Sequence, residues 1–414
     1  MMTRWLAAAG AAVIFTVPAA GHAAEWIGTW GAAPEPPRLA AGPFPATPSY
    51  HDQTIRQVVR IAAGGGRFRI RFTNEYGTKP LVIGAASLAR ADSKGDITAE
   101  SIRPLTFAGK RSVTIPAGAP YLSDPVELDA KPLSNLSISL YVPQDTGPCT
   151  CHGVGVQKAD VSGPGNFTDE PFMPKSTMQA RAFISGVEVE TSRPGKTIVA
   201  FGDSITDGVG STVNADRRWP DVLADRLTAR KGRTEWGVVN MGISGNRVLN
   251  DGAGQSALAR LDRDVLSEPG AAYVIVFEGV NDLGISYGHF SGPLAAAFKA
   301  QAAGGHVTAE EMIAGYRQII DRAHGRGLKV IGATIAPYEG AAYYSEEGEM
   351  VREAINRWIR TSGAFDGVVD FDAALRDPAD PKRIATPLQR GDHLHGSDAG
   401  YEAMARSIDL ALFR

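Results

Sequence analysis

The chain has 414 residues, of which 43% are hydrophobic and 21% charged, and its formal net charge is −3. The apolar fraction is large enough to build cores, which excludes a disordered chain, and the near-neutral charge gives no electrostatic case for a nucleic-acid partner. Two cysteines exclude a disulfide framework and a four-thiolate zinc site. At about 100–200 residues per domain, the length favours two domains.

The first residues have the layout of a secretory signal peptide. Arg4 gives a short positive region, and residues 5–17 form an apolar or small-residue run that is shorter than a membrane span. Small residues at Gly21 and Ala23 favour cleavage after Ala23. We therefore predict that residues 1–23 are a signal peptide and that the protein is periplasmic or secreted, without a stable membrane anchor. An uncleaved anchor is the alternative.

Residues 24–195 have the pattern of a domain built from short strands. Residues 54–62 and 68–73 alternate apolar and polar side chains, and the glycines at 64–66 separate them, which predicts a β-hairpin. Many short strands at such spacing indicate a β-sandwich, most simply of jelly-roll type. Further strands are expected at residues 81–89, 112–115 and 136–142.

The two cysteines lie close together, at Cys149 and Cys151, and His152 follows them. The pair can close in an oxidising compartment, but residues i and i+2 of a strand are about 6.5–7 Å apart, at the edge of disulfide reach. The sequence therefore leaves a disulfide open. A metal site that includes His152 is disfavoured, because three neighbouring residues do not readily converge on one ion.

Strands alternate with helices from residue 196 onward. This alternation predicts a parallel sheet with helices on both faces, a three-layer α/β/α domain, in which ligands bind beyond the carboxyl ends of the strands. Strands are expected at residues 197–201, 238–241, 272–277, 329–333 and 368–371. Helices are expected at residues 219–230, 258–266, 309–326, 346–361 and 397–412.

Three of the predicted strands end in residues suited to nucleophilic catalysis. Ser204, in Gly-Asp-Ser, follows the first strand, where a tight turn can present a nucleophile; an N-cap serine is the alternative. Gly242 follows the second and lets the backbone come close to a reacting atom. Asn281, in Gly-Val-Asn-Asp, follows the third, and its amide can donate to an oxyanion, although an Asx-turn would also explain it.

A fourth segment, just ahead of the last helix, carries an acid and a base. Asp392 and His395 are three residues apart, so the carboxylate can fix the imidazole tautomer and leave the other ring nitrogen free as a base. A metal site made of Asp392, His393 and His395 is the weaker alternative, because no further ligand cluster accompanies it.

The four segments, in this order, resemble the SGNH (GDSL-type) hydrolase family, whose four blocks supply Ser, Gly, Asn and His. The resemblance covers about residues 196–414 and implies a flavodoxin-like α/β/α domain. It implies that Ser204 is the nucleophile, that His395 is the general base and that Asp392 orients the base. One departure is Gly396, because the family usually has proline after the histidine.

The same resemblance implies an oxyanion hole and a metal-free, cofactor-free reaction. The donors would be the backbone N–H groups of Ser204 and Gly242 and the side chain of Asn281. We further assign Asp203, Asp282 and Tyr287 to the substrate pocket. The segment 286–307 is hypothesised to form a lid or pocket wall, with a solvent-facing insertion as the alternative.

Two longer stretches, residues 200–208 and 218–227, are similar to secreted bacterial arylesterase/acylhydrolases found beside xylan-degrading enzymes, as is Thr29-Trp30-Gly31. This resemblance implies a secreted esterase that removes acetyl or other short acyl groups from small-molecule or polysaccharide esters. A lysophospholipase, lipase or thioesterase is the alternative enzyme. A carbohydrate-binding protein with an inactive hydrolase domain is the alternative of another class. The oligomeric state is not predicted.

Overall fold

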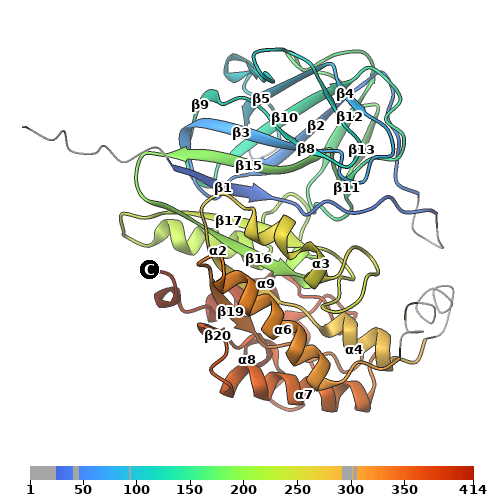
Figure 1. The fold of residues 1–414 in the computed structure, drawn as a ribbon, viewed down its shortest axis with the longest axis vertical. Coiled ribbons are helices and arrows are strands. Elements are labelled where there is room, and N and C mark those ends of the chain that lie inside the picture. The colour runs from blue at the N-terminus through green and yellow to red at the C-terminus, as the bar shows by residue number, and fades with distance from the viewer. Residues whose placement is uncertain (1–24, 41–45, 93–94, 291–300, 302–304) are drawn as a thin grey trace, which may run out of the picture.

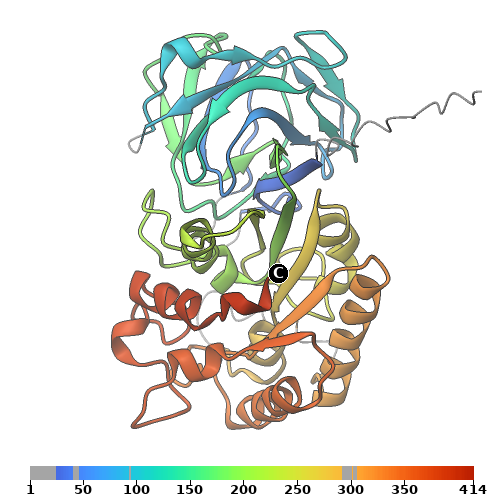
Figure 2. The same cartoon turned by 90° about the vertical axis from the view of Figure 1, so that its left-hand side faces the viewer.

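A computed structural model of the chain describes residues 25–40, 46–92, 95–290, 301 and 305–414 (Figure 1). The predicted signal peptide, residues 1–23, lies outside these residues. A strand-rich N-terminal region, residues 25–191, lies against an α/β region that begins at Gly195, and both views show the two regions stacked end to end (Figures 1 and 2). No helix of the described residues is long and apolar enough to cross a bilayer.

The N-terminal region contains two larger antiparallel sheets whose apolar side chains join in one buried core. One sheet has the order β1-β15-β3-β8, with β9 also paired to β3: β1 (Glu25–Gly31), β15 (Ile184–Thr191), β3 (Gly65–Thr73), β8 (Pro120–Leu122) and β9 (Val126–Ala130). The other has the order β13-β12-β2-β10-β5-β6: β13 (Ser176–Met178), β12 (Ala159–Pro164), β2 (Gln53–Arg60), β10 (Asn135–Val142), β5 (Ala85–Ala91) and β6 (Arg103–Pro104). Smaller elements are β4 (Leu81–Ile83) paired with β7 (Val113–Ile115), β11 (Cys151–His152) paired with β14 (Arg181–Ala182), and the 3₁₀ turn η1 (Ala99–Ser101).

The predicted hairpin at residues 54–73 is wrong, although both of its strands exist. β2 pairs with β10 and β12, whereas β3 pairs with β15, β8 and β9 in the other sheet. The link between them crosses from one sheet to the other, and the N–H of Ala62 donates to Thr29 O at 2.8 Å. The crossing fits a glycine at position 64, because a Cβ there would lie 2.5 Å from the backbone of Pro132.

Cys149 and Cys151 form a disulfide in the structure, with their Cα atoms 5.4 Å apart. This separation is shorter than the spacing expected along a regular strand, because Cys149 precedes β11 and does not belong to it.

The α/β region contains a parallel sheet with the order β17-β16-β18-β19-β20, and helices lie on either side of it (Figure 2). This order, in which the second strand of the chain lies outside the first, puts the topological switch point at β16. The strands are β16 (Gly195–Gly202), β17 (Glu235–Gly242), β18 (Ala271–Phe277), β19 (Lys329–Ala333) and β20 (Gly367–Val369). The helices are α1 (Ser204–Asp207), α2 (Trp219–Ala229), α3 (Ala257–Leu261), the π-helical turn η2 (Asp262–Leu266), α4 (Val280–Tyr287), α6 (Ala309–His324), α7 (Glu346–Thr361), α8 (Phe371–Leu375), η4 (Thr386–Leu388), α9 (Asp398–Ser407) and η5 (Leu410–Leu412).

Helix boundaries follow capping chemistry in this region. Helix α6 begins after Thr308, whose side chain forms a capping box with Glu311, and α9 begins after the N-cap Ser397. The predicted final helix is divided, because α9 stops at Ser407 and the chain continues into η5. The predicted strand at 368–371 is shorter than expected, because Asp370 caps a new helix, α8.

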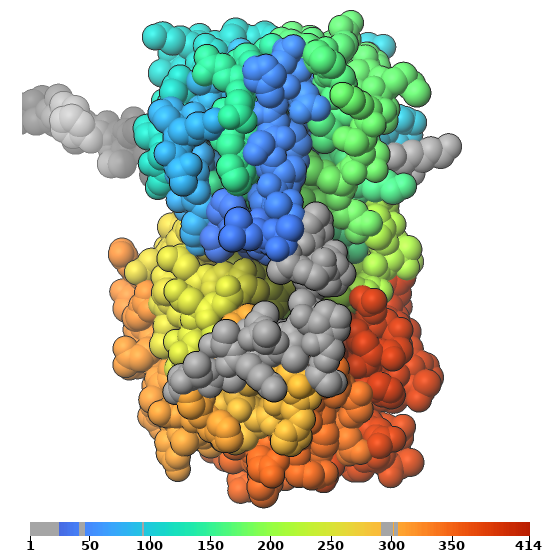
Figure 3. All heavy atoms as spheres, turned by 90° about the vertical axis from the view of Figure 1, so that its right-hand side faces the viewer, coloured from blue at the N-terminus to red at the C-terminus, as the bar shows by residue number. Residues whose placement is uncertain are grey.

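Charged pairs and backbone hydrogen bonds join the two regions. Arg60 Nη2 lies 2.5 Å from Asp225 Oδ1, and Arg71 forms a buried pair with Glu268. The N–H of Gly28 in β1 donates to Pro269 O at 3.0 Å. The space-filling view shows the early part of the described chain, in blue, against the yellow part of the α/β region (Figure 3).

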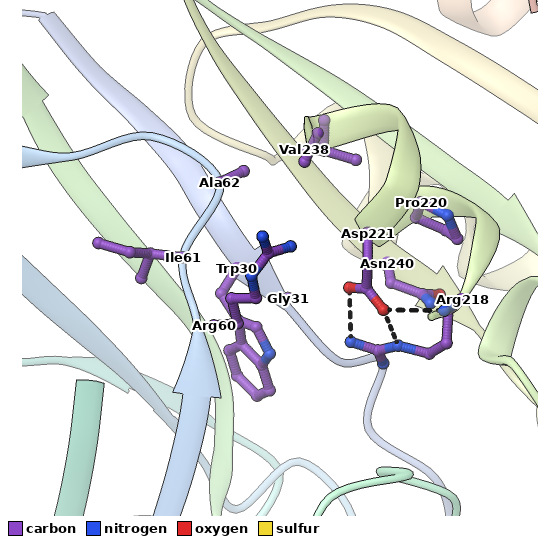
Figure 4. Close-up of a pocket in the computed structure, with 11 residues that line it drawn as sticks. Trp30, Gly31, Arg60, Ile61, Ala62, Arg218, Pro220, Asp221, Val238 and Asn240 are labelled. Atoms are coloured by element: carbon purple, nitrogen blue, oxygen red, sulfur yellow. Dashed lines mark hydrogen bonds and ion pairs between the residues drawn. The ribbon is translucent and has the colours of Figure 1, made fainter. Parts of the chain in front are cut away.

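A cavity of about 20 Å³, the size of one water molecule, lies at the junction between Trp30, Arg60 and Arg218 (Figure 4). Its walls include Asp221, whose carboxylate is paired with Arg218 as the dashed lines of Figure 4 show. None of the side chains predicted to be catalytic lines this cavity, and we assign it to packing.

Candidate active site

The turn after β16 presents Ser204. Helix α1 begins at this serine, and the N-cap Asp203 accepts a hydrogen bond from the N–H of Ile205 at 2.9 Å. Ser204 is therefore at the carboxyl end of the strand at the switch point, where an α/β sheet binds ligands. Ser204 is buried, with 5% of its surface exposed, so its hydroxyl is held by the fold.

The structure brings Ser204, His395 and Asp392 together. His395 Nε2 lies 2.8 Å from Ser204 Oγ, and His395 Nδ1 lies 2.8 Å from Asp392 Oδ2. With the proton on Nδ1, that nitrogen donates to the carboxylate, and Nε2 accepts from the serine hydroxyl. This is the arrangement that a serine nucleophile and its general base require.

Asp392 is held ionised by its neighbours. Partial burial opposes ionisation, but hydrogen bonds from the ring and from the backbone N–H of His395 outweigh it and keep the pKa of Asp392 well below its usual range. The backbone N–H groups of His395 and Leu394 donate to Asp392 Oδ1 at 2.9 and 3.1 Å. The carboxylate therefore fixes both the tautomer and the orientation of the imidazole.

The loop that carries His395 is anchored on both sides. The N–H of Arg390 donates to His395 O at 3.0 Å, and Tyr401 of α9 donates from its hydroxyl to Val209 O at 2.6 Å. Gly396, where the family usually has proline, is buried against the Tyr401 ring.

The structure does not support Gly242 as an oxyanion donor, and this prediction is wrong. Gly242 is the last residue of β17, and its N–H donates to Asn240 Oδ1 at 2.9 Å. Gly245, three residues later, has a φ of +82° and an N–H with no acceptor among the described residues. The N–H of Ser204 likewise has no acceptor among them.

Neighbouring contacts place Gly245 beside the nucleophile turn. Ser244 Oγ donates to Asp207 Oδ2 in α1 at 2.7 Å, and Asn246 O accepts from Asn281 Nδ2 at 3.0 Å. Gly245 therefore lies between contacts to α1 and to Asn281. The sequence does not show that the N–H of Gly242 is bonded and that of Gly245 is not, because this depends on their hydrogen-bond partners in the fold.

The Asn281 side chain is fixed by three groups. Its Nδ2 donates to Asn246 O and lies 3.3 Å from Asp203 Oδ2, and its Oδ1 accepts from the hydroxyl of Tyr343 at 3.2 Å. Tyr343 was not predicted, and no motif surrounds it in the sequence. Its contact orients the amide whose N–H groups point toward Asp203 and Asn246.

The three residues assigned to the substrate pocket, Asp203, Asp282 and Tyr287, each make a hydrogen bond within the protein. Asp203 and Asp282 are 2% and 1% exposed, and burial raises their pKa values to about 7 and about 6. Asp282 accepts from the N–H of Val248 at 2.8 Å, and Tyr287 donates to Val307 O at 2.8 Å. Of the hypothesised lid, residues 291–300 and 302–304 lie outside the described residues.

A buried arginine that the sequence did not single out joins three strand ends. Arg260 donates to Gly202 O at 2.9 Å and to Met241 O at 2.6 Å, at the ends of β16 and β17. It also donates to Asn246 Oδ1 at 2.9 Å and lies 3.1 Å from Glu278 Oε1, just after β18. This side chain is fully buried and fixes the backbone beneath the site.

In the part of the chain that the structure describes, no group of three or more His, Cys, Asp or Glu side chains is arranged to hold a metal ion. Independently of this, the site offers a serine hydroxyl, an imidazole base, a carboxylate and neighbouring N–H donors.

Comparison with known proteins gives a family match for the part of the chain that contains these residues. Residues 200–403 match the GDSL-like lipase/acylhydrolase family. Similar solved structures include a putative lipolytic protein of the G-D-S-L family from Desulfitobacterium hafniense (23% identity, 51% of this chain and 97% of that chain, TM-score 0.37). Another is a lipase/acylhydrolase from Enterococcus faecalis (20% identity, 51% of this chain and 92% of that chain, TM-score 0.37). A third is an acetyl xylan esterase variant from Geobacillus stearothermophilus (22% identity, 53% of this chain and 95% of that chain, TM-score 0.40). No curated protein sequence matches the chain. Residues 200–403, which contain Ser204, Asn281, Asp392 and His395, therefore form a GDSL-like lipase/acylhydrolase domain.

Proposed function

We propose that the protein is a carboxylic ester hydrolase in which Ser204 is the nucleophile, His395 the general base and Asp392 its orienting partner. The observation that carries the proposal is the continuous hydrogen-bonded chain from Asp392 Oδ2 through the imidazole to Ser204 Oγ, with both contacts at 2.8 Å. A serine hydroxyl is a weak nucleophile unless an adjacent base takes its proton.

In the first step, Ser204 Oγ attacks the ester carbonyl while its proton moves to His395 Nε2. Negative charge then develops on the carbonyl oxygen. We assign its stabilisation to the backbone N–H groups of Ser204 and Gly245, which have no acceptor among the described residues, and to the Asn281 amide. The amide would donate to the oxyanion with the N–H that now makes the longer contact, 3.3 Å, to Asp203 Oδ2, while the other N–H stays on Asn246 O. Gly245 replaces Gly242 in this assignment.

In the second step, the alcohol leaves with the proton from His395, and an acyl-enzyme remains on Ser204. Water then attacks the acyl carbon, loses a proton to His395 and releases the acid, after which the serine oxygen regains its proton. The ionised Asp392 stabilises the imidazolium that forms in both steps.

We propose acetyl and other short acyl esters of carbohydrates as substrates. Support comes from the sequence similarity of residues 200–208, 218–227 and Thr29-Trp30-Gly31 to secreted arylesterase/acylhydrolases. The proposal also includes a signal peptide at residues 1–23 and export from the cytoplasm. It further includes a β-sandwich accessory domain at residues 24–195 and a catalytic domain at residues 196–414.

The test is an acyl-chain series on purified protein. We expect hydrolysis of p-nitrophenyl acetate, release of acetate from acetylated xylan and a decline toward p-nitrophenyl decanoate. Ser204→Ala should abolish these activities. Ser211→Ala is the matched control, because Ser211 is also buried near α1 but donates to Gly208 O at 2.8 Å.

Other outcomes point to the alternatives. A preference for decanoate or for a thioester would transfer the assignment to a lipase or thioesterase. Binding of xylan without hydrolysis of any ester would support a carbohydrate-binding protein with an inactive hydrolase domain.

A further inference from the structure

His152 of the N-terminal region contacts the short helix α1 of the α/β region, which begins with the nucleophile. It lies in β11, is 3% exposed, and its Nε2 is 2.9 Å from Oδ1 of Asp207. Asp207 is the last residue of α1, the single turn of helix that begins with Ser204. A side chain 52 residues before the nucleophile therefore contacts the element that presents it.

The contacts of the imidazole require a proton on both nitrogens. Nδ1 faces Ala33 O at 2.9 Å and Glu35 Oε1 at 3.3 Å, and Nε2 faces Asp207 Oδ1 and Val154 O at 3.0 Å. All of these oxygens are acceptors, so only the imidazolium can donate on both sides. Burial opposes this charge, but the carboxylates of Asp207 and Glu35 raise the pKa of His152 to about 9.

The same Asp207 carboxylate also holds the segment proposed as oxyanion donor. Its Oδ2 accepts from Ser244 Oγ at 2.7 Å, and Ser244 is followed by Gly245. One carboxylate thus links His152 on one oxygen with the Gly245 segment on the other. Since Asp207 is only 1% exposed, water does not readily replace either partner.

The backbone around His152 is itself fixed. The disulfide between Cys149 and Cys151 closes immediately before it, and the N–H of Glu35 donates to Cys151 O at 2.8 Å. The N–H of Gly153 donates to Glu35 Oε1 at 2.8 Å. The imidazolium is therefore presented from a backbone held on both sides.

We propose that His152 is a positioning residue for catalysis: through Asp207 it holds both the turn that presents Ser204 and the segment that carries the Gly245 N–H. The N-terminal region then completes the geometry of the active site as well as packing against it. This inference rests on the proposed ester hydrolase function.

A second buried pair between the two regions provides a matched control. Arg71 of β3 pairs with Glu268, whose side chain is 2% exposed, and among the described residues no hydrogen bond or ion pair joins either of them to α1 or to the loop of His395. Glu268→Gln therefore removes a buried charge from the same junction while leaving the nucleophile turn alone.

The experiment compares wild type, His152→Ala, His152→Gln and Glu268→Gln, with kcat and KM for p-nitrophenyl acetate measured well below the melting temperature of each protein. We expect His152→Ala to lower kcat by about 10²-fold, because displacements on the order of 1 Å in a catalytic constellation have effects of this size. KM should stay near the wild-type value. His152→Gln should recover part of kcat, since its amide can donate to Asp207. Glu268→Gln should lower the melting temperature and leave kcat unchanged.

The rate at which a fluorophosphonate labels Ser204 gives an independent measure of nucleophile geometry, and it should fall in parallel with kcat. Wild-type kcat and labelling rate in folded His152→Ala would overturn the inference and reduce His152 to a packing residue. If His152→Ala does not fold, His152→Leu takes its place, because leucine fills the space but cannot donate to Asp207, and wild-type kcat and labelling rate in that variant would overturn the inference. A wild-type protein that neither hydrolyses esters nor is labelled would overturn the proposed function, and this inference with it.

Discussion

His395 Nε2 lies 2.8 Å from Ser204 Oγ, although 191 residues separate the two in the chain. Ser204 follows the first strand of the α/β region, and His395 precedes its last α-helix. The fold brings these two ends together at the switch point of the sheet. The serine therefore has its base only when these two segments, far apart in the chain, are folded together.

Replacing Asp392 by asparagine should remove the partner that fixes the imidazole. We expect Asp392→Asn to lower kcat by about 10³–10⁴-fold, because an amide can favour the wrong tautomer of His395. Asp398→Asn is the control, since Asp398 lies in the next helix and accepts from the N–H of Thr212 at 2.8 Å. The measurement is steady-state kinetics on p-nitrophenyl acetate. Equal losses of kcat in Asp392→Asn and Asp398→Asn would contradict the role assigned to Asp392.

Loss of the Asn281 amide should lower kcat more than loss of the Tyr343 hydroxyl that orients it. Asn281→Ala is expected to lower kcat by about 10²–10³-fold, as for the loss of one oxyanion donor. Tyr343→Phe removes the hydroxyl that donates to Asn281 Oδ1 at 3.2 Å, and it should produce a smaller loss.

Tyr338→Phe is the control for Tyr343→Phe, because the buried hydroxyl of Tyr338 has no partner among the described residues. Both phenylalanine variants should fold alike, and only Tyr343→Phe should lose kcat. A wild-type kcat in Tyr343→Phe would mean that the hydroxyl does not orient the amide.

The stability of the protein should depend on the charge of His152. Its pKa is raised to about 9 in the folded state, above its ordinary value, so its stabilising contribution is present below about pH 6.5 and is lost as the pH rises through about 9. Between about pH 6 and pH 10, the melting temperature of wild type should fall further than that of His152→Gln, because glutamine does not titrate in this range. Parallel losses measured by circular dichroism would contradict the charged state of His152.

Arg260 should contribute more to stability than its neighbour Arg263. Arg260→Met leaves Glu278 and Asp264 as buried carboxylates without their shared partner, and we expect a loss of about 3–5 kcal/mol in the free energy of unfolding. Arg263 is partly exposed, so Arg263→Met should lose less. Urea unfolding of the two variants measures the difference, and a larger loss in Arg263→Met would contradict this account.

The sequence allowed most elements of the α/β region to be predicted, because each is encoded locally. Helix α7 occupies residues 346–361 as expected from its apolar spacing, and the strands that end before Ser204 and Asn281 are continuous apolar runs. The predicted hairpin at residues 54–73 is wrong because alternation of apolar and polar side chains identifies a strand but not its partner. The partners of β2 and β3 lie far away in the chain.

The sequence likewise predicts some residues of the candidate site and not others. Ser204 stands out in a motif at a strand end, and Asp392 and His395 stand out in a motif just ahead of the last helix. The sequence predicts Gly242 as a donor but does not show which N–H groups are already bonded, and in the structure the N–H of Gly242 donates to Asn240. The contact between His152 and Asp207 joins two regions through a single pair of atoms, and no spacing in the chain encodes it.

The most direct measurement of the central claim is peptide mapping of the protein after treatment with a fluorophosphonate, which reacts with a serine activated by a base. We predict a single adduct on Ser204, which forms in wild type and is lost in His395→Ala. An adduct on another residue with Ser204 unmodified, or equal labelling in His395→Ala, would contradict the assignment of Ser204 and His395 as nucleophile and base.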